Sequence, residues 1–279
     1  MNSPQAPAKK SPAALGYRMP AEWVPHEAIW LAWPHDRDTF PNLQRVEQAY
    51  TEIAAAITPG EQLRLLVTGP EMRERAVRQM KKTETDLGRV RFYEHKYADV
   101  WFRDYGPIFL LSKDGKKRAM THWIFNAWGG KYPELFADTH IPELIAEKHP
   151  MERFTPGIVL EGGSIEVNGA GTVLTTEQCL LNKNRNPQLT RGQIETYLKD
   201  YLGVSNVLWL KEGVVGDDTD GHIDDIARFV GPRTVLCAYE DDPKDANHAI
   251  LKENFELLKS MKDQDGRALE VLKLPMPGA

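Results

Sequence analysis

Short apolar runs alternate with amphipathic stretches along the first third of the chain. The first run, at 28–33, ends at a proline, and this pattern is typical of a buried strand. At 42–57 apolar residues recur at helical spacing, which predicts a helix with one face packed inward. A second strand is predicted at 63–67, a charged helix at 71–82 and a third strand at 90–93. Alternation of this kind predicts an α/β fold.

From residue 108 onward the strands are predicted to form hairpins. An apolar run at 108–111 and a returning segment through 123–125 flank Asp114-Gly115, a strong hairpin signal. Further hairpins are predicted at 164–174 and 226–237. The helices that follow are predicted at 141–148, from a Thr190/Gln193 capping box onward and at about 246–261, and the closing strands at 157–160, 207–210 and 269–274.

The order of hairpin, helix and strand is an internal repeat with a period of about 50–60 residues, which is typical of a propeller or an array. We count four units, which begin near Ala28, Ile108, Ser164 and Ile226. Equivalent positions of a closed ring face one axis, so residues that are far apart in sequence can converge there. The repeat therefore predicts that a site, if there is one, lies on this axis.

The stretch from Gly216 to Asp225 carries five carboxylates, one histidine and two glycines. A solvated surface loop is the ordinary explanation of such an acidic run. Here the acids surround His222, and on an extended segment His222 and Asp224 share one face. A histidine and a carboxylate that point together into a cleft can bind a cation and move a proton. The stretch therefore predicts a functional site.

Two other acids stand before hairpins of the repeat. Asp104 precedes Gly106-Pro107 and is expected at a strand end or loop, three residues after Trp101. The alternative is an Arg103–Asp104 arrangement that only shapes the turn. Glu161 ends the apolar run 157–160 and would be desolvated unless another group pairs with it. The double glycine after Glu161 lacks the lysine of a phosphate-binding loop.

Composition narrows the class of protein. Of 279 residues, 41% are hydrophobic and 27% charged, as in a soluble globular protein. The net charge of −5 gives no basic field for nucleic acid, and no apolar stretch is long enough to cross a bilayer. Two cysteines provide no disulfide framework, which suits a reducing cytoplasm. Residues 1–19 lack the apolar region of a signal peptide and are predicted to be a disordered tail before a domain at 20–279.

Four motifs together resemble the agmatine deiminase family, which belongs to the pentein superfamily of guanidine-modifying enzymes. They are Trp101-Phe-Arg-Asp104-Tyr-Gly-Pro, Glu161-Gly-Gly-Ser, Thr175-Thr-Glu-Gln-Cys-Leu-Leu with Asn184-Arg-Asn-Pro, and Thr219-Asp-Gly-His222-Ile-Asp224-Asp-Ile-Ala-Arg-Phe-Val. The resemblance runs from about Gly16 to the last residue. It implies a five-module αβ-propeller with an axial active site, of which this chain would cover about four modules.

The implied reaction is hydrolysis of agmatine to N-carbamoylputrescine and ammonia through a covalent cysteine adduct, in putrescine biosynthesis. The resemblance implies that neither a metal nor an organic cofactor is needed. By motif, Asp104 and Asp224 would grip the guanidinium of the substrate, and His222 would serve first as general acid and then as general base. Glu161 would hydrogen-bond the guanidinium or orient His222.

The remaining implied contacts concern the rest of the substrate. Trp101 would line the cleft or stack on the cation, and Asp217, Asp218 or Asp220 would meet the distant amine. The expected partner is thus a small cationic guanidine, with neither nucleic acid nor membrane involved. A homo-oligomer is considered as an alternative to a monomer.

The family's nucleophile is a cysteine in a glycine-rich segment of the fifth module. Cys179 and Cys237 are predicted to be inert core residues instead. We therefore expect the chain to be a fragment that lacks this module. We further expect residues 1–279 alone to be poorly soluble or oligomeric, and without deiminase activity.

Three alternatives remain open from the sequence. Related sequences have been described as peptidylarginine deiminases, and that activity would need an open cleft. A guanidine-binding protein without catalysis would result if the chain truly ends at Ala279. A metal hydrolase that uses His222, Asp224 and Glu161 is disfavoured, because no HxxEH-type helix spacing is present.

Overall fold

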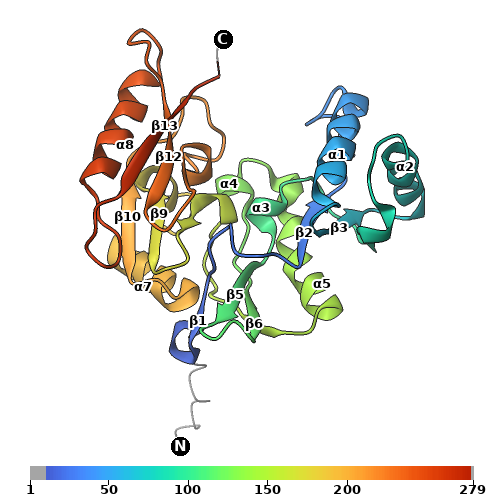
Figure 1. Cartoon of the computed structure of the whole chain (residues 1–279), viewed down its shortest axis with the longest axis horizontal. Helices are drawn as coiled ribbons and strands as arrows, with labels where there is room; N and C mark the ends of the chain where they lie inside the picture. The colour runs from blue at the N-terminus through green and yellow to red at the C-terminus, as the bar shows by residue number, and fades with distance from the viewer. Residues whose placement is uncertain (1–10, 278–279) are drawn as a thin grey trace, which may run out of the picture.

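Four small β-sheets and the helices between them make up the computed structural model, which describes residues 11–277 (Figure 1). The α/β class predicted from the sequence is confirmed. The first sheet contains β2 (Ala28–Ala32), β3 (Gln62–Val67) and β4 (Val90–Glu94), with α1 (Leu43–Ile57), α2 (Pro70–Met80) and the 3-10 turn η2 (Leu87–Arg89) between them. The second contains β1 (Tyr17–Arg18), β5 (Ile108–Ser112), β6 (Arg118–Thr121) and β7 (Glu152–Phe154), with α4 (Ala127–Gly130), η3 (Pro133–His140) and α5 (Ile141–Lys148) before β7.

The other two sheets come from the second half of the chain. The third contains β8 (Glu166–Val167), β9 (Thr172–Thr176) and β10 (Asn206–Leu210), with α6 (Glu177–Leu180) and α7 (Arg191–Leu202). The fourth contains β11 (Ala227–Phe229), β12 (Thr234–Tyr239) and β13 (Glu270–Pro275), with α8 (His248–Ser260). Short helical turns α3 (Phe102–Tyr105), η4 (Gly162–Ser164) and η5 (Ile223–Asp225) precede the hairpins of sheets two, three and four.

The predicted repeat is present in the last three sheets. In each, an antiparallel pair is followed by a helix and a strand that pairs in parallel, as with β8–β9 and then β10. The first unit differs, because β2, β3 and β4 are all parallel. Parallel neighbours need a long crossover, and α1 and α2 provide it. A hairpin-based repeat therefore does not describe the first unit.

Two strand boundaries predicted near the second sheet are wrong. The return strand is β6, several residues before the predicted 123–125, because the Asp114-Gly115 turn is tight and pairs Leu111 with Arg118. The closing strand is β7 and not 157–160, where Val159 forms only an isolated bridge with Ile124.

The predicted tail also needs correction where the structure describes it. Residues 1–10 lie outside the described part, but 11–19 contain the 3-10 turn η1 (Ala13–Leu15) and β1. β1 pairs with β5, and the Tyr17 ring packs against Phe154 with ring centroids 6.1 Å apart. Tyr17 is buried, so an apolar contact that the tail's composition does not reveal orders this segment.

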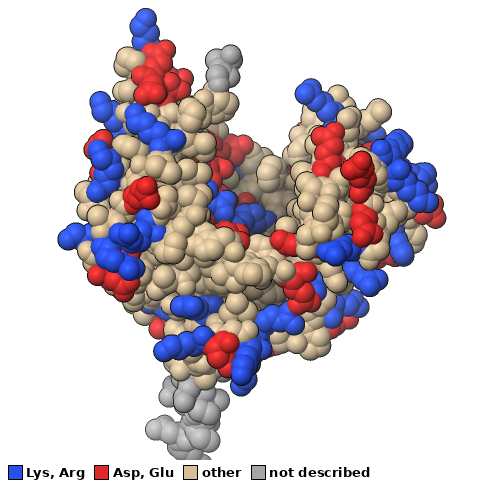
Figure 2. Space-filling view, in the orientation of Figure 1, with Lys and Arg blue, Asp and Glu red and all other residues tan. Residues whose placement is uncertain are grey.

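The cores hold the sheets in place around a hollow. One cluster joins Leu110 of β5, Val173 of β9 and Leu198 of α7, so the second and third sheets share a core. The predicted capping box of α7 is present. The Thr190 side chain accepts a hydrogen bond from the Gln193 backbone N–H, and the Gln193 side chain accepts one from the Thr190 backbone N–H. Figure 2 shows the hollow between the unit of β2–β4 and that of β11–β13, with acidic side chains inside it. In the described part of the chain, no helix is both long and apolar enough to cross a bilayer.

Candidate active site

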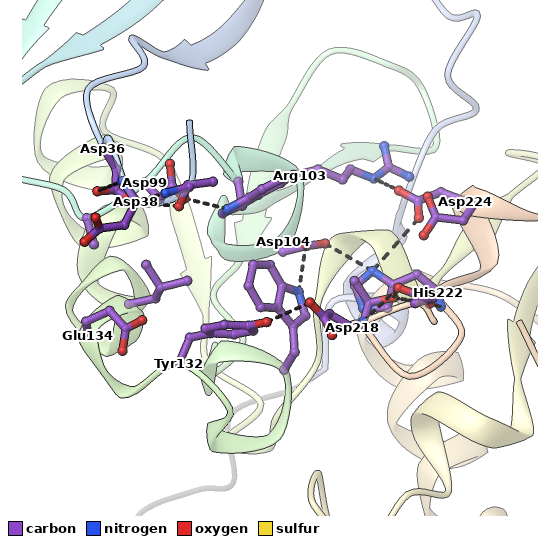
Figure 3. Close-up of a pocket in the computed structure, with 18 residues that line it drawn as sticks. Asp36, Asp38, Asp99, Arg103, Asp104, Tyr132, Glu134, Asp218, His222 and Asp224 are labelled. Carbon is purple, nitrogen blue, oxygen red and sulfur yellow. Dashed lines mark hydrogen bonds and ion pairs between the residues drawn. The ribbon is translucent and has the colours of Figure 1, made fainter. Parts of the chain in front are cut away.

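A cavity of about 980 Å³ opens where the loops of the different units meet. Nine of its lining residues are acidic, whereas Arg103 is the one lysine or arginine among them. The acids are Asp36, Asp38, Asp99, Asp104, Glu134, Asp217, Asp218, Asp224 and Asp225. In the view of Figure 3, Asp104, His222 and Asp224 lie on one side, and Asp36, Asp38 and Glu134 on the other. So many carboxylates around one space favour a cationic ligand.

Asp104 lies at the wall of this cavity, on the short helix α3. Trp128 Nε1 donates to its Oδ2 at 3.0 Å, and the Gly163 backbone N–H donates to its Oδ1 at 3.0 Å. Burial raises the pKa of Asp104 to about 6, although both hydrogen bonds favour the charged form. The carboxylate is therefore held in a fixed position, and its pKa lies closer to neutral pH than that of an exposed aspartate.

His222 is the centre of the cluster, with only 2% of its surface exposed. Its Nδ1 lies 3.6 Å from Asp104 Oδ1 and 4.0 Å from Asp224 Oδ1. Burial lowers the pKa of His222, and the charges of Glu161 and Asp224 oppose that shift. Two carboxylates thus face one ring nitrogen, an arrangement that suits a planar cation placed between them.

Asp224 lies in the middle of the turn η5, and its side chain is partly exposed to the cavity. The Arg103 guanidinium contacts it, with Nε 3.6 Å from Asp224 Oδ2. Burial raises the pKa of Asp224, while Arg103 acts in the opposite direction. Arg103 also pairs with Glu22 at 2.6 Å, and among the described residues no ion pair joins its guanidinium to Asp104. The alternative in which Arg103 and Asp104 form a turn-shaping pair does not describe this structure.

Glu161 is fully buried and pairs with Arg185, whose Nε donates to Glu161 Oε1 at 2.6 Å. Burial raises the pKa of Glu161, and the Arg185 charge opposes the shift. The pairing satisfies the sequence argument that a carboxylate at this position needs a partner. The second carboxylate oxygen of Glu161, Oε2, has no hydrogen-bond partner within the described residues, and neither has His222 Nε2.

The double glycine after Glu161 allows close approach of the backbone to the site. A Cβ at Gly163 would lie 2.5 Å from His222 Nδ1 and 2.7 Å from Asp104 Oδ1. A Cβ at Gly162 would lie 2.1 Å from the Arg103 carbonyl oxygen. Any side chain here would displace the acids or the histidine. Close packing at the site thus accounts for both glycines.

Asp217 organises the acidic loop from within. Its carboxylate accepts from the Gly221 N–H at 2.7 Å and from the Thr219 N–H at 2.8 Å. The backbone N–H of His222 donates to Asp217 at 3.3 Å. Asp217 lines the cavity, but its oxygen atoms hold the loop that presents His222.

Asp220 does not line the cavity. It accepts from Arg185 Nη1 at 2.8 Å, from Asn184 Nδ2 at 2.9 Å and from Lys131 Nζ at 2.6 Å. Burial alone would raise the pKa of Asp220, but these three donors hold it below its usual value. The expectation that Asp220 meets the substrate's amine disagrees with this placement. Its neighbour Asp218 does line the cavity and accepts from Tyr132.

Trp101 forms part of the cavity wall and keeps 39% of its surface exposed. Its Nε1 donates to Asp99 Oδ2 at 2.8 Å, which fixes the ring orientation. The ring meets Trp128 edge-on, with centroids 5.8 Å apart. An exposed indole face in an acidic cavity can stack on a cation.

Sequence reasoning missed two residues of the site, Trp128 and Arg185. Trp128 adopts a left-handed backbone with φ 52° and ψ 49°, which is uncommon for a large side chain and aims Nε1 at Asp104. The adjacent Gly129-Gly130 was the available signal, since paired glycines mark irregular backbone. Arg185 lies in one of the motifs that carry the family resemblance, but no role was predicted for it, and nothing local shows that it pairs with Glu161.

Neither cysteine has the surroundings of a reactive thiol. Cys179 and Cys237 are both fully buried. Burial raises the pKa of Cys179 well above its usual value and that of Cys237 to about 12. A thiol of this kind is protonated and a poor nucleophile, as the sequence analysis predicted for both.

Comparison with known proteins places this geometry in a family. The sequence model of the Porphyromonas-type peptidyl-arginine deiminases matches residues 18–279. An agmatine deiminase of Stutzerimonas stutzeri is 41% identical over 275 residues, which cover 96% of this chain and 73% of that protein. The structure of Enterococcus faecalis agmatine deiminase aligns with a TM-score of 0.89 and 36% identity, over 97% of this chain and 73% of that one. The substrate-bound C. jejuni agmatine deiminase aligns with a TM-score of 0.81 and 31% identity, over 94% of this chain and 74% of that one. The chain therefore belongs to the Porphyromonas-type peptidyl-arginine deiminase family.

Proposed function

We propose that this protein hydrolyses the guanidinium of agmatine, giving N-carbamoylputrescine and ammonia. The observation that carries the proposal is the pair of carboxylates, Asp104 and Asp224, that face His222 Nδ1 within an acid-lined cavity. The names of the relatives, agmatine deiminases at about 40% identity, support the same substrate. Because carbamoyl hydrolysis of the product would release putrescine, we assign the reaction to putrescine biosynthesis in the cytoplasm.

In this proposal Asp104 and Asp224 hold the guanidinium by charge-assisted hydrogen bonds, which suit its planar set of N–H donors. The bonds from Trp128 and Gly163 keep Asp104 in place before the substrate arrives. Positioning of this kind lowers the ordering cost of binding. Trp101 offers its exposed face for stacking on the cation, a contact worth about 0.5–2 kcal/mol.

His222 moves the protons in both half-reactions. A thiolate attacks the guanidinium carbon, the C–N bond breaks, and protonated His222 supplies the proton that lets ammonia leave. Neutral His222 then takes a proton from water as the water attacks the same carbon, and the C–S bond breaks to release the carbamoyl product. Glu161, whose Oε2 has no partner among the described residues, would stabilise the imidazolium between these steps.

We propose that the attacking thiol lies outside residues 1–279, in the fifth module of a ring whose other four modules are the sheets described above. Burial of Cys179 and Cys237 supports this proposal, as does the greater length of the aligned relatives. Replacing Cys237 by Ser should then leave ammonia release by the whole protein unchanged.

The charge of the cavity favours agmatine over a peptidyl arginine. Agmatine carries a second cation, its primary amine, whereas an arginine inside a peptide has only the guanidinium. Asp38 and Glu134 line the part of the cavity opposite His222 in Figure 3 and add negative charge there. We expect kcat/KM for agmatine to exceed that for a blocked arginine peptide, and the reverse order would favour peptidylarginine deimination.

The test is ammonia release from agmatine by the whole protein, with N-carbamoylputrescine identified by mass spectrometry. His222→Ala should abolish turnover, whereas the exposed His140→Ala should not. Asp104→Asn should weaken agmatine binding by about 2–5 kcal/mol, since it removes one charge of a desolvated pair. The matched control is Asp200→Asn on the exposed face of α7. Full activity in His222→Ala would refute the assignment.

A further inference from the structure

Cys179 belongs to a buried cluster that the proposed reaction does not use as a whole. One carboxylate oxygen of Glu161, Sγ of Cys179 and one ring nitrogen of His222 all lie within 4.8 Å of one another. All three residues are buried, with exposures of 0%, 0% and 2%. They come from the segments around η4, α6 and η5, so two side chains belong to the third unit of the fold and one to the fourth.

Two atoms in this cluster lack the partners that buried polar atoms normally have. Glu161 Oε2 and His222 Nε2 receive no hydrogen bond from the described residues. An unpartnered buried polar group is destabilising, so a ligand that engages both atoms would recover free energy. A cysteine alone would not indicate a metal site. Here the Cys179 thiol lies beside Glu161 Oε2 and His222 Nε2, the two atoms without a hydrogen-bond partner among the described residues.

The donor set selects the chemistry of the ligand. Cys179 is a thiol in the metal-free protein, and an ion that binds its sulfur displaces the proton. Thiolate sulfur, imidazole nitrogen and carboxylate oxygen together are the ligands of Zn²⁺ and of softer divalent ions. Zinc bonds of about 2.0–2.3 Å put tetrahedral ligand atoms about 3.3–3.8 Å apart. The present spacing needs side-chain movements of only about 1 Å to reach that geometry.

The surroundings permit a divalent cation despite the nearby arginine. Arg185 is engaged by Glu161 Oε1 and also by Asp220, so its charge is shared between two carboxylates. Asp104 and Asp224 add two further negative charges on the other side of His222. Of the three residues only His222 lines the cavity, so an ion would enter past its ring to reach Glu161 and Cys179.

We propose that Glu161, Cys179 and His222 form an inhibitory binding site for a thiophilic divalent cation of the Zn²⁺ or Cd²⁺ type. A bound ion withdraws His222 from proton transfer and Glu161 from support of the imidazolium. The binding half of this inference is independent of the proposed reaction, whereas the inhibitory half rests on it.

Cadmium titration of the whole protein tests the binding half, and comparison of Cys179→Ala with Cys237→Ser assigns the band to one thiol of this chain. The readout is the ultraviolet charge-transfer absorption of a cadmium–thiolate bond, with affinity from calorimetry. We expect one equivalent of Cd²⁺ to produce the band, and Zn²⁺ to displace it. Cys179→Ala should remove the band and lower affinity at least about tenfold, since even outer-shell changes cost 10–100-fold.

The matched control is Cys237→Ser, which removes the other buried thiol, on β12, and should leave both band and affinity unchanged. Glu161→Gln should weaken binding while keeping the band, because the thiolate remains. Circular dichroism of each variant confirms that it is folded. An unchanged band in Cys179→Ala, or its loss in Cys237→Ser, would overturn the site.

Inhibition is measured separately, on the whole protein with agmatine, against each variant's own metal-free rate. Micromolar Zn²⁺ should lower the rate of Cys237→Ser and have at least about tenfold less effect on Cys179→Ala. Cadmium binding that depends on Cys179 without any Zn²⁺ inhibition would leave the ion site standing and refute its inhibitory role. If agmatine is not a substrate at all, the cadmium titration still decides the site.

Discussion

At the scale of single residues, the local sequence indicated Asp104, His222 and Asp224. Carboxylates close to one another repel, so their grouping beside glycines favours a functional site. The local sequence could not point to Arg185 or Trp128. Their partners are Glu161, 24 residues away, and Asp104, also 24 residues away, and only the folded chain brings them into contact. Local composition reveals which residues carry charge, whereas the pairing of those charges depends on tertiary structure.

The raised pKa of Asp104 predicts how agmatine binding depends on pH. Since burial puts this pKa at about 6, the carboxylate becomes neutral as the pH falls through 6, and its attraction for a cation is lost. Below that pH the affinity contributed by Asp104 should fall by up to about tenfold per unit. Calorimetry between pH 5 and 8 measures this, with Asp104→Asn as the comparison. An equally steep loss in that variant would assign the effect to another group.

The same shift acts in the opposite direction on the stability of the free protein. A carboxyl whose folded pKa is raised binds more protons when folded than when unfolded. Between the ordinary aspartate pKa of 3.8 and about 6, Asp104 therefore favours folding less as the pH rises. Bound agmatine should reverse this sign, because the cation stabilises the ionised form.

At the scale of elements, the periodic helices were predictable because a repeat of apolar residues on one face specifies both the helix and the side that packs. The segment 157–160 was wrongly predicted as a strand because an apolar run indicates burial and not strand pairing. It is indeed buried at Ile158 and Leu160, but Val159 makes a single bridge.

The acidic loop gives a prediction at this scale. Asp217 accepts the N–H groups of Thr219, Gly221 and His222, so Asp217→Ala leaves these donors without their acceptor. We expect a loss of about 1–3 kcal/mol in the free energy of unfolding and faster hydrogen exchange at the Gly221 amide. The control is Asp218→Asn, whose carboxylate accepts only from the Tyr132 hydroxyl. Equal exchange rates in both variants would show that Asp217 does not hold the loop.

At the scale of the whole molecule, the repeat identified three of the four units correctly and predicted that Asp104, Glu161 and His222 would converge. The repeat did not predict the parallel first sheet. The order of strands and helices along the chain does not show whether two successive strands pair as a hairpin or in parallel. Nor could the repeat predict which units share a core. That depends on how side chains such as Leu110 and Val173 fit together across sheets.

The convergence of loops from different units makes the cavity sensitive to the order in which the molecule comes apart. Apart from β1, the strands of each sheet come from one continuous part of the chain, so a sheet can survive while its docking to its neighbours is lost. With rising urea, agmatine binding should therefore disappear at a lower concentration than the far-ultraviolet circular dichroism signal. Both are followed on the same samples. Coincident midpoints would mean that the units unfold as one cooperative body.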